Sequence, residues 1–369
     1  MAQFQINFTD PKGFYYEGET VAGNATVVLR EEMRFHKLTI KFKGKSYCRW
    51  TTGSGDDRKS HWNHEDYFKE KVILLTAASS SNDIWLGPGE YNYPFSFHLP
   101  TNLPPTFESA RDTGYVRYYM KVAFDMDSIL KSDIEAKIPF IVVATPSDLD
   151  LRPNLLEPVN DTREKLLCCL CCQSGPIRLR CQLNKQAFYI GEPIIFSVEV
   201  DNRETDKDLR KVEAMLVKEV VLISTTSWKE RHHFPESSVV LTQGVQARAE
   251  ESWQNIRLNI PANITPSFEN CKCVHVNYQF VVAVDIPSAI DTSVTFPITV
   301  ANGIQTSQPL VNPPMIHDVP PVQQYGMPSA PSAGMYQQAY PPPIVAQPPP
   351  SQPPPPYPVD NLTKDKSAQ

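Results

Sequence analysis

Polar and apolar residues alternate with a period of two along much of the chain, as in residues 37–43, 116–124 and 177–183. This period places one face of a β-strand in a core and the other face in water. Turn signals such as residues 53–56 and 201–202 separate the short runs, and no long segment has a helical period. The pattern predicts an all-β protein built from antiparallel β-sandwiches, with little helix.

One sequence motif occurs twice in the chain, at residues 95–108 and again at residues 256–269. At an offset of 161 residues (256 minus 95), the identities are Pro100, Asn102, Pro105, Phe107 and Glu108 against Pro261, Asn263, Pro266, Phe268 and Glu269. A second block follows each copy, where Tyr118, Ala123 and Asp125 match Tyr278, Ala283 and Asp285. A third block precedes each copy, where Tyr16, Gly18, Glu19 and Val27 match Tyr189, Gly191, Glu192 and Val200. We therefore predict two versions of one domain in tandem.

The domain boundaries follow from length and composition. A length of 369 residues suits two domains that each bury a core. The first domain is predicted at residues 1–147, a proline-containing linker at 148–173, and the second domain at 174–302. About half of the 35 prolines lie after residue 308. Residues 303–369 are therefore predicted to form a disordered, proline-rich tail.

Charge and hydropathy narrow the class of protein. The net charge of −6 and the lack of long runs of like charge give no reason to expect nucleic acid as a partner. Residues 1–10 have neither the basic region nor the apolar core of a secretion signal. No stretch reaches the roughly eighteen apolar residues of a membrane span. These features predict a cytoplasmic protein.

Signatures of catalysis are missing from the sequence. We find no glycine-rich phosphate loop, no nucleophile elbow and no paired-carboxylate signature. His61 and His64, with Asp66, are ligand types at a metal-like spacing, but the surrounding residues favour a solvated loop or strand edge. We therefore predict a protein that is not an enzyme and that has no metal and no cofactor.

Four of the eight cysteines crowd into one short segment, as Cys168, Cys169, Cys171 and Cys172. Three interpretations are open: inert linker residues, reversible palmitoylation beside Leu166, Leu167 and Leu170, or a thiol redox or metal site. Four thiolates within five residues are too close together to surround one tetrahedral metal ion, which disfavours a metal site. The βαβ surroundings of a redox motif are also missing, which disfavours a redox site. Palmitoylation would give peripheral membrane association, because an acyl chain inserts into the bilayer.

The tail carries a peptide motif of the form Pro-Pro-x-Tyr, at Pro354, Pro355 and Tyr357. A run of prolines already adopts the polyproline II helix, so binding costs it little conformational entropy. WW domains use this property: paired prolines stack between groove aromatics, and the tyrosine fills a neighbouring pocket. The alternative is a disordered spacer in which the motif arose by composition. Only one complete copy occurs, so avidity from two linked motifs is not expected.

Several motifs in sequence order resemble the arrestin family. Residues 86–100, 107–108 and 116–122 are similar to the signature of the arrestin N-domain, and residues 174–177 and 189–192 introduce a segment similar to the arrestin C-domain. The proline-rich tail makes the chain resemble the α-arrestins, also called arrestin domain-containing proteins. The resemblance covers roughly residues 5–302. It implies two sandwiches of seven or eight strands that work together as a cytoplasmic adaptor.

The function that this resemblance implies is recruitment of a ubiquitin ligase. The sandwiches would bind the cytoplasmic part of a membrane receptor or transporter, the cargo, and the tail motif would bind a WW-domain HECT-type ligase. Cargo ubiquitination, endocytosis and protein transport would follow at the plasma membrane and endosomes. One alternative is a retromer-type endosomal sorting scaffold that recruits no ligase. Another is a thiol redox or metal-binding protein that uses the segment Cys168 to Cys172.

Overall fold

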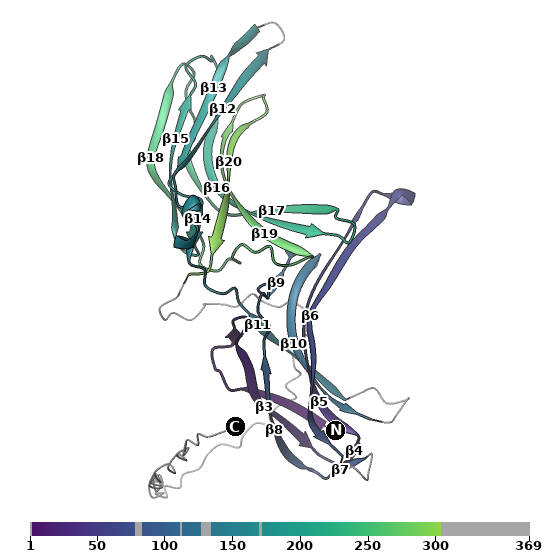
Figure 1. Ribbon diagram of the computed structural model, residues 1–369. Coiled ribbons are helices and arrows are strands. Elements are labelled where there is room, and N and C mark those ends of the chain that lie inside the picture. Colours follow the sequence, from purple (N-terminus) through teal and green to yellow (C-terminus); the bar gives the residue numbers. More distant parts are fainter. Residues whose placement is uncertain (1, 78–82, 111–112, 127–133, 170–171, 304–369) are drawn as a thin grey trace, which may run out of the picture. The chain divides into compact units, whose positions relative to one another are not determined.

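The computed structural model describes residues 2–77, 83–110, 113–126, 134–169 and 172–303 (Figure 1). The chain divides into two units, residues 1–319 and 320–369, and both sandwiches belong to the first. Among the described residues there is no α-helix. The predicted all-β architecture of two sandwiches is confirmed, whereas the predicted tail lies outside the described residues.

The first sandwich has two main sheets. The smaller has the order β1-β3-β8, with β1 (Ala2–Phe8), β3 (Thr20–Leu29) and β8 (Gly89–His98). The larger has the order β2-β11-β10-β5-β6, with β2 (Phe14–Tyr15), β11 (Glu135–Val142), β10 (Gly114–Asp125), β5 (Lys37–Thr52) and β6 (Lys59–Thr76); β9 (Phe107–Glu108) also pairs with β10. A separate pair joins β4 (Met33–Phe35) to β7 (Ile84–Leu86), and the 3-10 helix η1 (Gly55–Asp57) lies between β5 and β6.

The second sandwich repeats this plan. One sheet has the order β12-β13-β15-β18, with β12 (Val159–Cys169), β13 (Cys172–Leu183), β15 (Pro193–Asp201) and β18 (Glu250–Asn259). The other has the order β14-β20-β19-β16-β17, with β14 (Ala187–Tyr189), β20 (Thr292–Ala301), β19 (Val274–Asp285), β16 (Lys211–Ile223) and β17 (Lys229–Thr242). In each copy a short strand pairs in parallel with the last long strand, β2 with β11 and β14 with β20.

The segment 148–173, predicted as a linker, has structure of its own. It contains the 3-10 helices η3 (Leu149–Leu151) and η4 (Pro153–Leu155), and strand β12. Strand β12 pairs with β13 along most of its length, beginning with Val159 opposite Leu183. Proline has no backbone N–H, so Pro158 marks the point before which regular strand pairing is not expected. Residues 159–169 contain no proline, so each residue of β12 has a backbone N–H that can take part in strand pairing.

The period of two in the sequence decides which side chains enter the core. In β19, buried and half-buried residues alternate from Val274 to Asp285 without interruption. Strand β10 follows the same pattern from Gly114 to Val122. One face of each strand therefore packs against the opposite sheet, and the other face remains available to solvent or partners.

The repeated motif and the repeated block that follows it form the same hydrogen bonds in both sandwiches. The hydroxyl of Tyr118 donates to the carbonyl of Pro104 at 2.7 Å, and Tyr278 donates to the carbonyl of Thr265. Each bond ties the segment that follows β8 or β18 to a central strand of the opposite sheet. The backbone N–H of Thr106 donates to Val142 at 2.7 Å, and that of its counterpart Ser267 donates to Val300 at 2.8 Å. The sequence duplication is thus a duplication of physical contacts.

The third repeated block, which contains Tyr16 and Tyr189, forms the same tight turn in both copies. The N–H of Tyr16 donates to the Glu19 carboxylate at 2.8 Å, and the N–H of Tyr189 donates to Glu192 at 2.9 Å. Between them, Gly18 and Gly191 adopt φ angles of +75° and +82°, which a side chain with a Cβ rarely reaches. The glycine and the glutamate are both required by this turn.

The two tyrosine hydroxyls generate a stability prediction. Burial raises the pKa of Tyr118 and of Tyr278, so both phenols stay protonated and able to donate. Replacing Tyr118 or Tyr278 by Phe leaves a buried carbonyl without its donor, which should cost about 1–3 kcal/mol of unfolding free energy. Denaturant unfolding of each variant measures this loss.

A matched control is Tyr93→Phe, because the Tyr93 ring is only half-buried and its hydroxyl faces no such carbonyl among the described residues. It should change the unfolding free energy by no more than about 0.5 kcal/mol. Equal effects of all three substitutions would show that the two phenol contacts are not special.

Candidate functional site

The residues predicted to bind a WW domain lie outside the described residues: Pro354, Pro355 and Tyr357. The cysteine cluster is described only in part. Strand β12 ends with Cys168 and Cys169, strand β13 begins at Cys172, and Cys169 is the cross-strand partner of Cys172. Cys171 falls outside the described residues. The WW-binding role and the chemistry of these four thiols therefore remain predictions.

The two histidines with metal-like spacing do not converge. His61 is buried, stacks on the Trp50 ring at 5.1 Å, and shares a hydrogen bond of 2.9 Å with Thr52. His64 is exposed and lies opposite Tyr47, on the other face of the sheet. Residues three apart in a strand point to opposite faces, which explains the separation. Within the described ranges, no group of three His, Cys, Asp or Glu side chains could hold a metal ion.

Cysteines that looked scattered in the sequence meet where the two sandwiches join. The hydroxyl of Ser46 donates to the Cys273 sulfur, and that of Tyr67 donates to the Cys271 sulfur, both at 3.2 Å. The Cys48 thiol donates to the carbonyl of Ile223 at 3.3 Å. Hydrogen bonds that involve uncharged cysteine sulfurs therefore link the two sandwiches at their junction, which we call the seam. Sequence reasoning missed it, because the paired residues are about 200 positions apart.

Three of the buried cysteines, the seam residues Cys271 and Cys273 together with Cys181 on β13, are poor nucleophiles. A hydrogen bond with Cys273, together with burial, raises the pKa of Cys271. For Cys273 the contact with Cys271 lowers the pKa, but the contact with Cys48 and burial outweigh it and raise the pKa to about 12. Burial raises the pKa of Cys181 to about 12. Because the thiolate is the reactive form, these three cysteines serve packing at neutral pH. Cys48 differs, since its contact with Cys273 lowers its pKa.

Strand β6 extends the seam with polar contacts. The Asn63 amide donates to the carbonyl of Lys272 at 2.9 Å, and the Glu65 carboxylate accepts from the Lys272 backbone at 3.0 Å. The N–H of Thr225 donates to the carbonyl of Trp62 at 3.0 Å. A Cβ at Gly114 would lie only 2.8 Å from a Leu222 methyl, so this glycine permits the close approach. The core is accordingly one connected cluster through both sandwiches.

A small pocket opens beside the seam. It has a volume of about 370 Å³ and is lined by Tyr47, Arg49, Ser60 and Trp62. We call these four residues the aromatic pocket. The Trp62 side chain is 47% exposed, and Trp228, whose ring lies 5.4 Å from that of His61, is 63% exposed. Exposed tryptophan and arginine are the residue types that dominate binding hot spots. The geometry therefore suits contact with another molecule better than catalysis.

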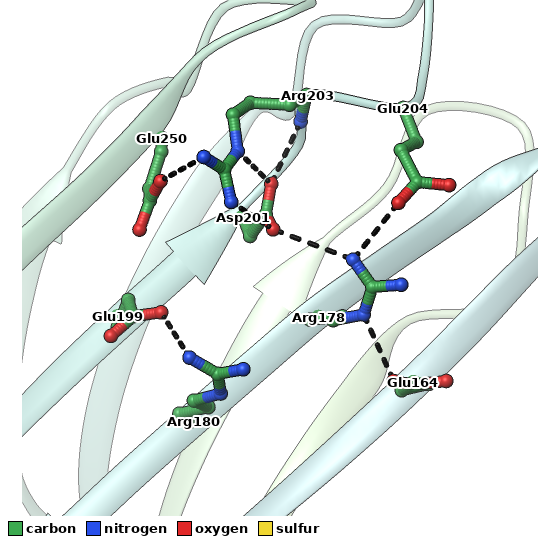
Figure 2. A network of polar contacts seen from close by, with 8 residues as sticks. All are labelled: Glu164, Arg178, Arg180, Glu199, Asp201, Arg203, Glu204 and Glu250. Carbon is green, nitrogen blue, oxygen red and sulfur yellow. Dashed lines mark hydrogen bonds and ion pairs between the residues drawn. The ribbon is translucent and has the colours of Figure 1, made fainter.

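A polar network covers one sheet of the second sandwich (Figure 2). Arg178 on β13 contacts Glu164 on β12 at 2.9 Å and Glu204 at 3.0 Å, and it reaches Asp201 at 3.5 Å. Arg203 binds the same Asp201 through two hydrogen bonds of 2.9 and 3.0 Å. Figure 2 shows the pairs interlocking across neighbouring strands, with Arg180 bound to Glu199 alongside. Since each arginine already has a carboxylate partner, the network stabilises the sheet and offers little free charge to a ligand.

Comparisons with known proteins assign both halves of the chain. The model of the arrestin (or S-antigen) N-terminal domain matches residues 4–149, and that of the arrestin C-terminal domain matches residues 173–304. A mouse protein named arrestin domain-containing protein 4 is 24% identical over 300 residues, covering 79% of this chain and 69% of its own. Arrestin domain-containing protein 17 of Caenorhabditis elegans is 24% identical over 345 residues, covering 90% and 77%. Among the described residues no helix has the length and apolarity to cross a bilayer.

The Figure 2 network generates a pH-dependent prediction. Hydrogen bonds from the Arg203 side chain and backbone, with the charges of Arg203 and Arg178, hold the pKa of Asp201 well below 3.8. A depressed pKa contributes stability that is present above the unfolded value and lost as the pH falls toward the folded value. Asp201→Asn should lower the unfolding free energy at pH 7 by about 1–3 kcal/mol, and the deficit should shrink below about pH 4.

Thermal unfolding of wild type and variant between pH 3 and pH 7 measures this difference. Glu164→Gln is the control: the Glu164 side chain is 58% exposed, and exposed pairs contribute at most about 1 kcal/mol. A deficit for Asp201→Asn that stays constant across the pH range would contradict the assignment of the stabilisation to the ionised carboxylate.

Proposed function

The chain belongs to the arrestin family, among its α-arrestin or arrestin domain-containing members, and we propose that it is an adaptor that brings a ubiquitin ligase to membrane-protein cargo. Membership of this family indicates an adaptor or trafficking role. The observation that carries the finer proposal is one chain with two joined arrestin sandwiches followed by a Pro-Pro-x-Tyr motif. The sandwiches supply a binding surface, and the tail supplies a second, separate binding peptide.

The tail motif is proposed to bind a WW domain of a HECT-type ligase. Pro354 and Pro355 would stack between aromatic side chains of the WW groove, and the Tyr357 ring would enter the adjacent pocket. The composition of the segment, polar and rich in proline, supports this proposal, because such a sequence can bury too little apolar surface to be expected in a sandwich core. One chain that holds ligase and cargo together raises their effective concentration, so a weak peptide contact is sufficient for transfer.

The sandwiches are proposed to bind the cytoplasmic part of a receptor or transporter at the plasma membrane or endosomes. The exposed tryptophans and the aromatic pocket support this role, because Trp62 and the pocket lie on the part of the first sandwich that adjoins the second, and Trp228 lies on the adjoining part of the second. Palmitoylation of Cys168, Cys169, Cys171 and Cys172 would hold the adaptor near such cargo. Cys168 and Cys169 end β12 and Cys172 begins β13, an arrangement that is compatible with that proposal.

Replacing Tyr357 by Ala tests ligase recruitment. Removing the ring should empty one of the two pockets through which a WW domain holds its ligand, with a loss of about 2 kcal/mol, or about thirtyfold in affinity. Titration of wild-type and variant chains against an isolated WW domain measures the change. The melting temperature of the chain should stay the same, because a segment so polar and rich in proline is not expected to join a sandwich core.

Tyr340→Ala is the matched control, since Tyr340 lies in the same tail but follows Gln338 and Ala339 instead of paired prolines. It should leave the affinity unchanged. Equal affinities of wild type and Tyr357→Ala would refute recruitment through this motif and leave the retromer-type scaffold, which needs no ligase, as the better explanation.

A further inference from the structure

Two thiols from different sandwiches meet inside the seam. Cys48 lies on β5 of the first sandwich, and Cys273 directly precedes β19 of the second. A hydrogen bond joins the two side chains, and both residues are completely buried. The two cysteines are 225 positions apart in the sequence (273 minus 48), so only the joining of the sandwiches brings them together.

The backbone of Ile223 holds both cysteines in place. The Cys48 thiol donates to the carbonyl of Ile223 at 3.3 Å, and the N–H of Ile223 donates to the carbonyl of Cys273 at 2.9 Å. From the first sandwich, the Ser46 hydroxyl donates to the Cys273 sulfur at 3.2 Å. Ser46 and Cys48 are two positions apart on β5, so their side chains leave the same face of the strand. These contacts place the Cys273 sulfur next to that of Cys48.

The lack of a side chain at Gly114 allows this close approach. Gly114 is the cross-strand partner of Cys48. A Cβ at this position would lie 3.5 Å from the Cys48 Cβ, 3.1 Å from a Val274 methyl and 2.8 Å from a Leu222 methyl. Strands β16 and β19 of the second sandwich therefore pack directly beside Cys48. A bond between sulfurs of the two sandwiches requires backbones this close together.

The two thiols are chemically unequal. A hydrogen bond with Cys273 lowers the pKa of Cys48, against the effect of burial. For Cys273 the contact with Cys271 lowers the pKa, but the contact with Cys48 and burial raise it to about 12. Cys48 is therefore the first of the two to form a thiolate, while the neutral Cys273 thiol remains beside it. A nucleophilic thiol with a second thiol in contact is the arrangement of a redox-sensitive pair.

We propose that Cys48 and Cys273 are a site of reversible oxidation, at which hydrogen peroxide converts the two thiols into a disulfide that ties the sandwiches together. The Cys48 thiolate attacks one peroxide oxygen and the O–O bond breaks, which leaves a sulfenic acid on Cys48. The departing hydroxide takes up the proton that Cys48 released and becomes water. The Cys273 sulfur then attacks the Cys48 sulfur, the S–O bond breaks, and the hydroxyl leaves with the Cys273 proton as a second water. Two electrons pass from the thiols to one peroxide.

The remaining seam cysteine, Cys271, is placed differently. Its sulfur accepts hydrogen bonds from the Tyr67 hydroxyl at 3.2 Å and from the N–H groups of Cys273 and Val274 at 3.4 and 3.3 Å. These donors occupy the lone pairs with which the sulfur would have to attack. We therefore expect Cys273, and not Cys271, to bond to Cys48.

A narrow rim of contacts separates the thiol pair from solvent. Asn63 on the edge strand β6 is the cross-strand partner of Cys48, and its amide donates to the carbonyl of Lys272 at 2.9 Å. The Lys272 side chain is 78% exposed. Hydrogen peroxide is nearly as small as water, so a local opening of this edge admits it without unfolding either core.

The test treats the full chain with hydrogen peroxide, blocks the remaining free thiols and maps disulfides by mass spectrometry. The chain carries serine at four cysteines that could pair with one another: Cys168, Cys169, Cys171 and Cys172. Trypsin separates the three seam cysteines, because it releases residues 46–49 and cleaves between Cys271 and Cys273, after Lys272. We expect a linked peptide pair that contains Cys48 and Cys273, which dithiothreitol separates. No link, or a link that contains Cys271 instead, would overturn the proposal.

Single substitutions in the same chain test the specificity of the link. Cys48→Ser and Cys48→Ala should form no link, and the second variant covers the case in which the first does not fold. Cys181→Ser is the matched control. Cys181 is also buried, and among the described residues no hydrogen bond joins it to another thiol. The control should form the link as its parent does, and loss of the link in this variant would refute a specific pair.

The route of the oxidant has its own test. Asn63→Ala removes a contact of the rim, so the disulfide should form at least about threefold faster. An equal or lower rate would refute entry along the edge of β6.

The link should also raise the thermal stability of the chain. A disulfide between residues 48 and 273 restricts the unfolded chain, so the oxidised protein should melt several degrees above the reduced protein. Cys48→Ala should show no such gain on oxidation, and an equal gain would assign the effect to another site and overturn the proposal. Tyr357→Ala should form the link as its parent does, because the tail motif takes no part in it. Failure of ligase recruitment and failure of this site are therefore distinguishable.

Discussion

Two buried phenol groups connect the opposing sheets, one in each sandwich. After β8 and after β18 the chain leaves one sheet as an irregular, proline-containing segment, whose carbonyls need donors once they are buried. Tyr118 and Tyr278 supply those donors from central strands of the opposite sheet, at Pro104 and Thr265. Each hydroxyl bond links the crossing segment to the opposite sheet and satisfies a buried carbonyl. Both halves of the chain therefore contain the same hydrogen bond from a tyrosine hydroxyl to a buried carbonyl.

The second assembly step joins the sandwiches without burying an isolated charge. At the seam, thiols and hydroxyls exchange neutral hydrogen bonds, and the ring of Phe107 meets its repeated counterpart Phe268 edge to face at 5.8 Å. The ion pair of Glu65 with Lys272 lies at the rim, where the Lys272 side chain is 78% exposed. A seam of this kind avoids the desolvation penalty of buried ions. It also holds the aromatic pocket at a fixed place beside the second sandwich.

The outward strand faces of the two sandwiches carry different side chains. In the larger sheet of the first sandwich, the inward residues of β5 and β10 build the core, and the outward residues include Lys41, Lys43 and Lys45 on β5 and Lys121 on β10. Lys43 is paired with Asp66, and Lys121 is paired with Glu135. In the second sandwich, the arginines of the Figure 2 network are paired with carboxylates on neighbouring strands. One fold, used twice, therefore presents a lysine-bearing face in one copy and an arginine–carboxylate network in the other.

The sequence alone determined the β class, the duplication and the order of the domains, because strand period, tight turns and repeated motifs depend on residues close together in the chain. Gly18 and Glu19 were visible in the sequence as members of a repeated block, and the structure shows that this block forms a tight turn. The hydrogen bonds of Ser46 with Cys273 and of Tyr67 with Cys271 were not visible, nor was the separation of His61 from His64. Those features depend on strand register and on contacts between residues far apart in sequence, which only the tertiary structure decides, because no local pattern specifies which strand a residue will face.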